Sequence, residues 1–277
     1  MTVRNRRQMT VACIESVLRE GQEAEILVSV VVVDDGSCDG TAEAISALKS
    51  SRVQVVECSG GLFWAAGMAL GEKIALRQLP DYVLWLNDDV ILDPGFLEVL
   101  LKTSDEFGAV VTVGATCDAE TGATTYSGLR RARRHPLTFR LVEPAATALE
   151  IDTFNGNVVL VPRKVLEAVG GIDGSFAHAY ADIDFGLRLS RSGHRAVLAA
   201  GHVGTCARNS TDGTWRDRSL APTRRLQLLH SRKGAPPRSS ARFLRRHGGP
   251  VWPVFLATPY VRIMRETLFR PTPRGRP

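Results

Sequence analysis

The chain has 277 residues, 44% of them hydrophobic and 23% charged, which is typical of a soluble globular protein built as one large domain, or as one domain with an appendage. No apolar run approaches the length of a transmembrane helix, and the first residues lack the apolar core of a signal peptide, so we expect a cytoplasmic location. The five cysteines are scattered singly, which favours free thiols over disulfides or a zinc site.

Charge is distributed unevenly along the chain. The net charge is +6, but residues 222–277 contain 13 Lys and Arg and one acidic residue, Glu266, so the rest of the chain is acidic. This asymmetry indicates that the tail binds a partner of negative charge, such as a membrane surface or a nucleic acid.

The first part of the chain alternates helices and strands. In chain order we predict a helix at 9–20, a strand at 26–33, a turn at 34–41, a helix at 41–50, a strand at 53–56, and a loop at 58–71 leading into a helix that ends near 77. This alternation predicts an α/β fold with a mostly parallel central sheet and flanking helices.

A central strand, 82–87, ends in Asn87-Asp88-Asp89. Its apolar run indicates a strand buried on both faces, and in open α/β sheets ligands bind at the C-terminal ends of such strands. Two adjacent carboxylates repel each other there unless a cation is near, and a hard divalent ion is the natural partner. The alternative is that Asp88 and Asp89 cap the turn or the helix expected at 94–103.

A second acidic pair follows in the middle of the chain. The basic cluster Arg130–His135 is either a solvated loop or a contact for an anion or an acceptor. Asp182 and Asp184 lie in the first turn of a predicted helix, where the helix dipole favours negative charge, and His202 follows a strand. The other elements predicted here are a strand at 109–114, a hairpin turn at Thr121-Gly122, a turn and strand at 152–162, a helix at 163–169, a helix from Asp182 to Gly193, and a strand at 196–200.

The tail, from about residue 214, alternates basic and apolar residues. We predict helices at 224–230 and 239–247, and disorder from Arg270 to Pro277. The segments 252–257 and 260–264 combine aromatic and apolar residues with nearby arginines, which suits either a segment lying on an anionic bilayer or packing against the rest of the protein.

Four motifs occur in an order that resembles one family. Val33-Asp34-Asp35-Gly36-Ser37, Asn87-Asp88-Asp89, Asp182-Ile183-Asp184 and His202 each lie at a predicted strand or helix end. Over residues 1 to about 210 they resemble the inverting, nucleotide-sugar-dependent glycosyltransferases of family 2, which have the Rossmann-like GT-A fold, and among these the bacterial rhamnosyltransferase-like and galactofuranosyltransferase-like members. The resemblance implies a GT-A catalytic domain at 1–213, with a nucleotide-sugar half at about 1–114 and an acceptor half at about 115–213, followed by a basic helical extension at 214–277.

The resemblance also implies which residues bind the donor. Asp35 matches the aspartate that binds the nucleotide base, and Asp88 would face the nucleotide ribose or solvent. Thr2-Val3-Arg4-Asn5-Arg6 is similar to the end of the family's first strand, which implies nucleotide contacts for Thr2 and Asn5. The family has several more apolar residues before this threonine, so either the pocket edge is shortened or the natural start lies earlier. Gly61 and Trp64 fall in a segment similar to the loop under the sugar nucleotide.

The catalytic residues are implied in the same way. Asp89 and His202 would hold a divalent ion, Mg²⁺ or Mn²⁺, and Asp182 would be the general base. Asn155, Asp184 and Arg188 are candidates for binding or orienting the acceptor. One departure from the family is Ala181, which stands where the family has a glutamate before the base.

The implied function is transfer of a hexosyl or deoxyhexosyl group, with inversion, from a nucleoside-diphosphate sugar to a hydroxyl of a glycan, a lipid-linked or a natural-product acceptor. No nucleic-acid partner is then expected, and the basic tail would contact the inner face of the membrane. An alternative is a non-catalytic nucleotide-binding relative with a decayed site, which Ala181 supports. A dinucleotide enzyme is disfavoured because no Gly-x-Gly-x-x-Gly follows the first strand.

Overall fold

The computed structural model describes residues 1–132 and 138–268. Two compact units are present: unit 1 comprises residues 1–176 and 180–208, and unit 2 comprises residues 177–179 and the chain from 209 onward. Arg133-Arg134-His135 of the predicted basic cluster lie outside the described residues, as does the predicted disorder from Arg270 to Pro277.

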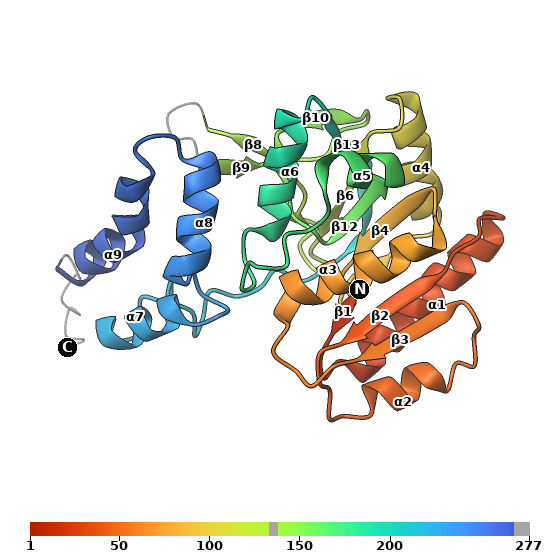
Figure 1. Ribbon diagram of the computed structural model, residues 1–277, viewed down its shortest axis with the longest axis horizontal. Helices are drawn as coiled ribbons and strands as arrows, with labels where there is room; N and C mark the ends of the chain where they lie inside the picture. The colour runs from red at the N-terminus through yellow and green to blue at the C-terminus, as the bar shows by residue number, and fades with distance from the viewer. Residues whose placement is uncertain (133–137, 269–277) are drawn as a thin grey trace. The chain divides into compact units, whose positions relative to one another are not determined.

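Unit 1 begins with a small parallel sheet in the order β1-β2-β3 (Figure 1). All five residues of β2, four valines and Asp34, are buried, as expected for the middle strand of a covered sheet. Helix α3 packs against β1 and β2, and α1 contacts α2. The bounds are β1 (Thr2–Val3), α1 (Arg7–Glu23), β2 (Val30–Asp34), α2 (Thr41–Ser46), β3 (Val53–Glu57) and α3 (Phe63–Ala75), followed by the 3₁₀ turn η1 (Leu76–Gln78).

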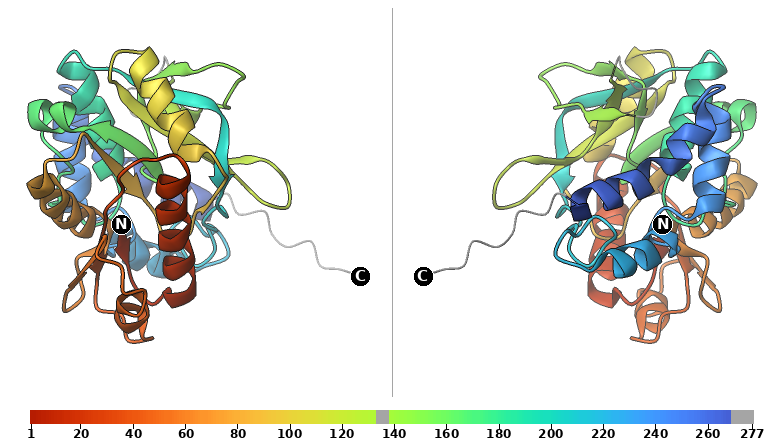
Figure 2. Two further views of the ribbon diagram at one scale, coloured as in Figure 1. Left: turned by 90° about the vertical axis from the view of Figure 1, so that its right-hand side faces the viewer. Right: turned by 90° about the vertical axis from the view of Figure 1, so that its left-hand side faces the viewer.

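The main sheet has the order β10-β13-β6-β12-β4, with β5 added to β13 and β7 added to β6. Helix α4 packs against β6 and β13, and in Figure 2 it lies on the same side of unit 1 as α1. The bounds are β4 (Tyr82–Leu86), β5 (Ile91–Leu92), α4 (Phe96–Glu106), β6 (Val111–Cys117), β7 (Thr124–Tyr126), β10 (Leu149–Ile151), β12 (Val158–Pro162) and β13 (Ala196–Thr205).

The α/β class with flanking helices is confirmed, but the prediction of a mostly parallel sheet is wrong for this main sheet. β13 and β6 run parallel, whereas β12 lies between β4 and β6 and runs antiparallel to both. All five residues of β12 are buried, as in a central parallel strand, so its apolar run does not reveal its direction. The mixed sheet therefore follows from tertiary pairing rather than from the local pattern.

A third, antiparallel sheet has the order β11-β8-β9. The hairpin turn predicted at Thr121-Gly122 is confirmed, because it joins the paired strands β6 and β7. Helix α6 packs against β11, and α5 packs against β12. The remaining bounds in unit 1 are β8 (Gly128–Arg131), β9 (Phe139–Leu141), β11 (Thr153–Phe154), α5 (Arg163–Val169) and α6 (Ala181–Arg191).

Three aromatic side chains link the sheets to α6. The Trp85 and Phe185 rings meet edge to face with centroids 4.7 Å apart, and Phe154 lies 6.2 Å from Phe185. All three are almost fully buried. Burial of such large rings fixes α6 against β4 and β11, and each residue contributes roughly 2–3 kcal/mol of apolar burial.

Unit 2 contains three helices in the described residues: α7 (Pro222–His230), α8 (Pro237–His247) and α9 (Trp252–Leu268). Helices α7 and α8 cover the two segments that were predicted to be helical. Glu266 of α9 pairs with Arg218, Arg225 and Arg262. These pairs lower the pKa of Glu266 to about 2, with the Arg225 hydrogen bond as the largest cause. Across the described residues, no helix is long and apolar enough to cross a bilayer.

Candidate active site

The Asn87-Asp88-Asp89 triplet directly follows β4, and its first residue is fixed by both its backbone and its side chain. The Asn87 N–H donates to the carbonyl of Asn157 at 2.9 Å. The Asn87 side-chain oxygen accepts a hydrogen bond from Trp64 Nε1 at 2.7 Å. Since Trp64 lies in the first turn of α3, this bond ties the start of that helix to the end of β4.

The two aspartates of the triplet share one guanidinium. Arg6 Nη1 lies 3.0 Å from an oxygen of Asp88 and 2.8 Å from an oxygen of Asp89. Asp88 is only 4% exposed and also accepts a hydrogen bond from Thr10 Oγ1, so its side chain anchors α1. Burial raises the pKa of Asp88, opposed by Arg6. The structure thus places Asp88 inward, whereas Asp89 is half-buried and faces the Arg6 side.

The structure does not bring His202 and Asp89 together. His202 Nε2 lies 2.9 Å from Thr124 Oγ1, and Thr124 is also bonded to Glu143. The residue that lies at Asp89 is Cys206, directly after the end of β13, and its Sγ lies 3.8 Å from the Asp89 carboxylate. His202 precedes Cys206 by four positions, which is roughly 13 Å at the usual rise of a strand.

The remaining geometry fits a divalent ion held mainly by substrate. Among the described residues no three His, Cys, Asp or Glu side chains form a metal cluster. Magnesium-type sites commonly use one or two carboxylates and complete their shell with phosphate oxygens and water. Asp89 would supply such a carboxylate, and it already pairs with one cation, the guanidinium of Arg6. Cys206 is a poor ligand, because burial raises the pKa of its thiol to about 12.

Asp182 opens α6 and lies beside this cluster. Its two carboxylate oxygens accept hydrogen bonds from the backbone N–H groups of Gly156, at 3.0 Å, and Ile183, at 2.8 Å. A Cβ at Gly156 would lie 2.6 Å from the Trp64 ring and 3.2 Å from the Asp182 Cβ. Only a glycine fits there, so Trp64 and Asp182 meet at Gly156. Burial raises the pKa of the Asp182 carboxyl, and the N–H donors partly oppose this.

The residues predicted for the nucleotide pocket lie around the first βα turn. Both oxygens of Asp35 accept backbone hydrogen bonds, from Leu62 and Phe63 at 2.8 Å, so this buried side chain shapes the loop before α3. Gly61, in the same loop, has φ +94°. Asn5 accepts from the Cys38 N–H, and its own N–H donates to Ser37 Oγ. A Cβ at Gly67 would meet Thr2 Oγ1 at 2.2 Å, so Thr2 contacts the middle of α3.

The residues predicted to orient the acceptor are mostly engaged within the protein. Asp184 is fully buried and forms an ion pair of 2.8 Å with Arg188. Arg188 also donates to the carbonyls of Val169, Gly170 and Gly171, which fixes the end of α5. Asn155 is half-buried, and its N–H donates to the carbonyl of Ser127.

Sequence reasoning missed several residues of the site. Arg6 and Cys206 contact Asp89, Gly156 contacts Asp182, and Asn157 accepts a hydrogen bond from Asn87. Arg6 lay within the quoted first-strand motif and is the residue that a search for a cation near two carboxylates would have found. Gly156 and Cys206 act through tertiary contacts, which no local spacing reveals.

The fold and the site together define a class of protein. Two solved structures each have a TM-score of 0.51 with this chain. One is a mannosyltransferase from Pyrobaculum calidifontis in complex with GDP-Man and Mn²⁺, which is 16% identical, and the match covers 98% of this chain and 75% of that one. The other is GalNAc-T7 with UDP, GalNAc and Mn²⁺, which is 11% identical, and the match covers 66% of this chain and 38% of that one. At these identities the likeness concerns the fold, which is that of GT-A glycosyltransferases. A model of Glycosyl transferase family 2 matches residues 1–170, so the chain belongs to that family.

Two of the relatives in sequence have names that state an activity or a pathway. The O-antigen biosynthesis protein RfbC of Myxococcus xanthus is 30% identical over 50% of this chain. The N-acetylglucosaminyl-diphospho-decaprenol L-rhamnosyltransferase of Mycobacterium tuberculosis is 26% identical over 61% of this chain. The matched part spans 11% of the first relative's length and 63% of the second's.

Proposed function

We propose that this chain is an inverting transferase that moves a sugar from a nucleoside diphosphate to an acceptor hydroxyl, with Asp182 as the general base. One observation carries the proposal: Asp182 and Trp64 meet at Gly156, and Trp64 is bonded to Asn87, two residues before Asp89. A base and a candidate metal ligand thus belong to one continuous cluster at the end of β4. The nucleotide-sugar half would be about 1–114 and the acceptor half about 115–213.

In this proposal Asp89 holds a divalent ion, Mg²⁺ or Mn²⁺. Bound there, the ion would neutralise the charge that develops on the departing diphosphate. The manganese complexes of the two structural neighbours support this choice. Since His202 lies with Thr124 and Glu143, we assign the other coordination positions to diphosphate oxygens and water instead of the histidine.

The Asp182 carboxylate accepts the proton of the acceptor hydroxyl as that oxygen attacks the anomeric carbon. A raised pKa suits this role, because a base is most effective when its pKa approaches the working pH. The backbone donors from Gly156 and Ile183 keep the carboxylate oriented. A single attack on the face opposite the diphosphate inverts the anomeric centre.

Isothermal titration with UDP, GDP and dTDP, with and without Mn²⁺, tests the donor side. We expect metal-dependent binding of at least one of them, followed by metal-dependent hydrolysis or transfer when the matching nucleotide sugars are screened. Absence of metal-dependent binding would reject the transferase proposal. Binding without any turnover would favour the non-catalytic relative suggested by Ala181.

We also propose that the acceptor is carried at a membrane, because the decaprenol-linked substrate in the name of one relative is a lipid and α9 has an exposed apolar face. Val254, Val261, Met264 and Leu268 are each more than half exposed, and their spacing places them on one side of the helix. Residues 209–268 contain 12 Lys and Arg against 3 Asp and Glu. An apolar stripe on a cationic unit is complementary to an anionic bilayer.

Vesicle flotation tests this contact. The full chain should float with phosphatidylcholine vesicles that contain phosphatidylglycerol, less so as salt is raised, and not with phosphatidylcholine alone. Val254→Glu with Val261→Glu should abolish flotation, whereas Val99→Glu, at an exposed valine of α4, should not. Loss of binding in all variants, or a concentration-dependent dimer formed through α9, would reject the bilayer as the partner.

A further inference from the structure

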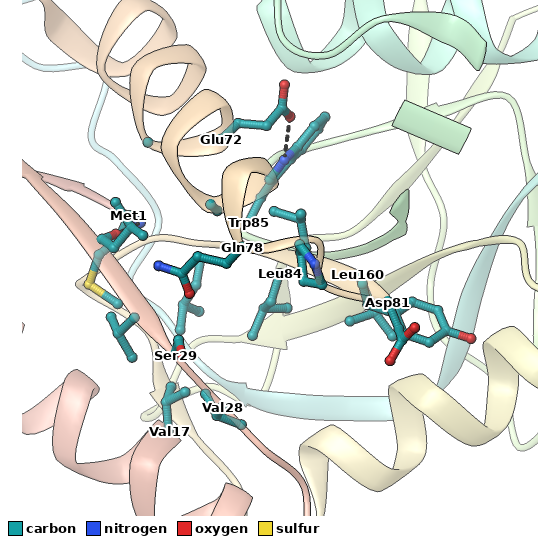
Figure 3. Close-up of a pocket in the computed structure, with 18 of the residues that line it drawn as sticks. Met1, Val17, Val28, Ser29, Glu72, Gln78, Asp81, Leu84, Trp85 and Leu160 are labelled. Carbon is teal, nitrogen blue, oxygen red and sulfur yellow. Dashed lines mark hydrogen bonds between the residues drawn. The ribbon is translucent and has the colours of Figure 1, made fainter. Parts of the chain in front are cut away.

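Glu72 is a buried carboxyl group to which the proposed reaction gives no role. It lies in α3, is 7% exposed, and lines a cavity of about 540 Å³ between β2 and β4 (Figure 3). Most of the cavity lining is apolar. A carboxyl group in such surroundings is costly unless each oxygen has a hydrogen-bond donor.

Each oxygen of Glu72 has a donor from a different element. Trp85 Nε1 of β4 donates to one oxygen at 2.9 Å, the bond drawn in Figure 3. The Ile172 N–H, in the segment after α5, donates to the other at 3.1 Å. A Cβ at Gly171 would lie only 1.5 Å from this second oxygen, so the backbone passes directly over the carboxyl group. One side chain therefore joins α3, β4 and the 170–172 segment.

Each of these three elements leads to a residue of the candidate active site. Helix α3 carries Trp64 in its first turn, and β4 runs directly into Asn87. The 170–172 segment is bound by Arg188, which donates a hydrogen bond to the Gly171 carbonyl at 2.6 Å. Arg188 belongs to α6, which has Asp182 in its first turn. Glu72 is therefore connected to the same cluster through α3, through β4 and, by way of Arg188, through α6.

We propose that Glu72 is a positioning residue: it locks α3, β4 and the 170–172 segment to one another, and so sets how Trp64 and Asp182 are placed around Asn87. Its effect on turnover rests on the function proposed above. The coupling between Glu72 and Trp64 does not, because it is a property of the fold and can be measured without any substrate.

The protonation of Glu72 offers a way to measure that coupling. Burial raises the pKa of Glu72 to about 7, against the N–H donors of Ile172 and Trp85 and the nearby charge of Arg188. Arg188 faces it from α6 and is paired with Asp184. The cavity is also lined by Asp81 and by the amino group of Met1, whose pKa burial lowers to about 6. The substitution Glu72→Gln removes only the Glu72 carboxyl group, so it identifies which signal changes depend on that group.

The test follows the indole ¹H–¹⁵N signals of Trp64 and Trp85 in the full chain as pH is varied, with assignments from tryptophan-to-phenylalanine variants. We expect both signals to titrate with a shared midpoint near 7, and Glu72→Gln to remove that midpoint from both. Glu20→Gln changes another buried glutamate, on α1, and should leave both titrations intact. Titration of Trp85 alone, or of neither signal, would overturn the coupling.

Kinetics test the positioning role separately, once a donor is known. Glu72→Gln should lower kcat by about 10- to 100-fold, with a smaller change in the donor KM, because displaced reacting groups impair the chemical step more than binding. Trp85→Phe removes one of the two bonds and should give a smaller loss of the same kind. An unchanged kcat in Glu72→Gln would overturn the positioning role. A wild-type chain without transferase activity would instead refute the proposed function. In that case the NMR titration alone would test the coupling between Glu72 and Trp64.

Discussion

At the scale of single residues, the candidate site depends on backbone donors as much as on charged side chains. Asp35 and Asp182 each have both carboxylate oxygens bonded to N–H groups of the main chain. Such bonds fix the direction of a carboxylate without neutralising it. In the proposed function, these bonds orient the Asp182 carboxyl group to receive the proton of the acceptor hydroxyl.

Asp182→Asn should reduce turnover by about 10²- to 10⁴-fold, the usual contribution of a general base. Binding of the nucleoside diphosphate should be nearly unchanged, because the base acts on the acceptor. Steady-state rates and isothermal titration measure the two effects. Asp118→Asn, in an exposed turn, serves as the control and should alter neither. Turnover that survives the Asp182 change would mean that another group takes the proton.

Arg6→Gln should strengthen Mn²⁺ binding in the absence of nucleotide. The guanidinium now neutralises Asp89, and its removal leaves a net negative charge for the ion. Electron paramagnetic resonance of free Mn²⁺ measures the affinity. The same change should lower stability by roughly 1–3 kcal/mol, because buried Asp88 loses a charged partner. Weaker metal binding in Arg6→Gln would show that Arg6 does not compete for the metal position.

Strand and helix ends located several candidate residues from the sequence, whereas contacts made across the fold could not be predicted from it. Asp89 and Asp182 stand where the end of β4 and the start of α6 place them. The family resemblance implied that His202 and Asp89 hold one metal ion, but β13 continues past His202 to Thr205, and the next residue, Cys206, lies at Asp89. The length of β13 therefore determines that Cys206, and not His202, lies next to Asp89.

At the scale of elements, the close packing of α3 on the parallel sheet is set by small residues. A Cβ at Gly67 would lie 2.2 Å from Thr2 Oγ1, while one at Gly71, a turn further along, would lie 3.3 Å from Val33. The two glycines share a helix and differ mainly in the space available. They therefore form a matched pair for testing how tightly β1 and α3 must pack.

Gly67→Ala should destabilise unit 1 by about 1–3 kcal/mol through overpacking against β1. Gly71→Ala should be near neutral, because the better helix propensity of alanine offsets a mild contact by about 1 kcal/mol. Urea unfolding of both variants measures the difference. Equal stabilities would show that β1 moves freely away from α3.

The elements themselves were more predictable than their pairing. Apolar periodicity located α1, α4 and α6 within a few residues, because one face of each helix must be buried. The direction of β12 and the small sheet of β8, β9 and β11 depend on which strands meet across long loops. That information lies in tertiary packing, and alternating local patterns do not contain it.

At the scale of the whole molecule, stability should depend on pH through Glu72. Its pKa of about 7 in the folded state exceeds the ordinary value of 4.5, so the folded chain binds this proton more tightly. The stabilisation is fully present below pH 4.5 and is lost as pH rises through about 7, an effect on the order of 3 kcal/mol. Urea midpoints at acidic and alkaline pH should therefore differ more for the wild type than for Glu72→Gln. A pH dependence unchanged by the substitution would contradict the assignment.

The two units also differ in charge. Residues 209–277 hold 15 Lys and Arg and 3 Asp and Glu, which leaves residues 1–208 acidic overall. This division was visible in the sequence, because charge can be counted without a fold. The exposed stripe on α9 was not, since the same apolar residues would serve equally well in a buried helix.

The distribution of the five thiols makes the protein suitable for site-directed labelling. Cys38 is exposed, whereas Cys13 and Cys206 are buried and burial raises the pKa of each thiol to about 12. A maleimide dye at mildly alkaline pH should therefore react far faster at Cys38 than at these two. Because the Cys38 N–H is bonded to Asn5, the dye would sit on the proposed nucleotide loop. Its fluorescence would report donor binding directly, so candidate nucleotide sugars can be sorted before any acceptor has been found.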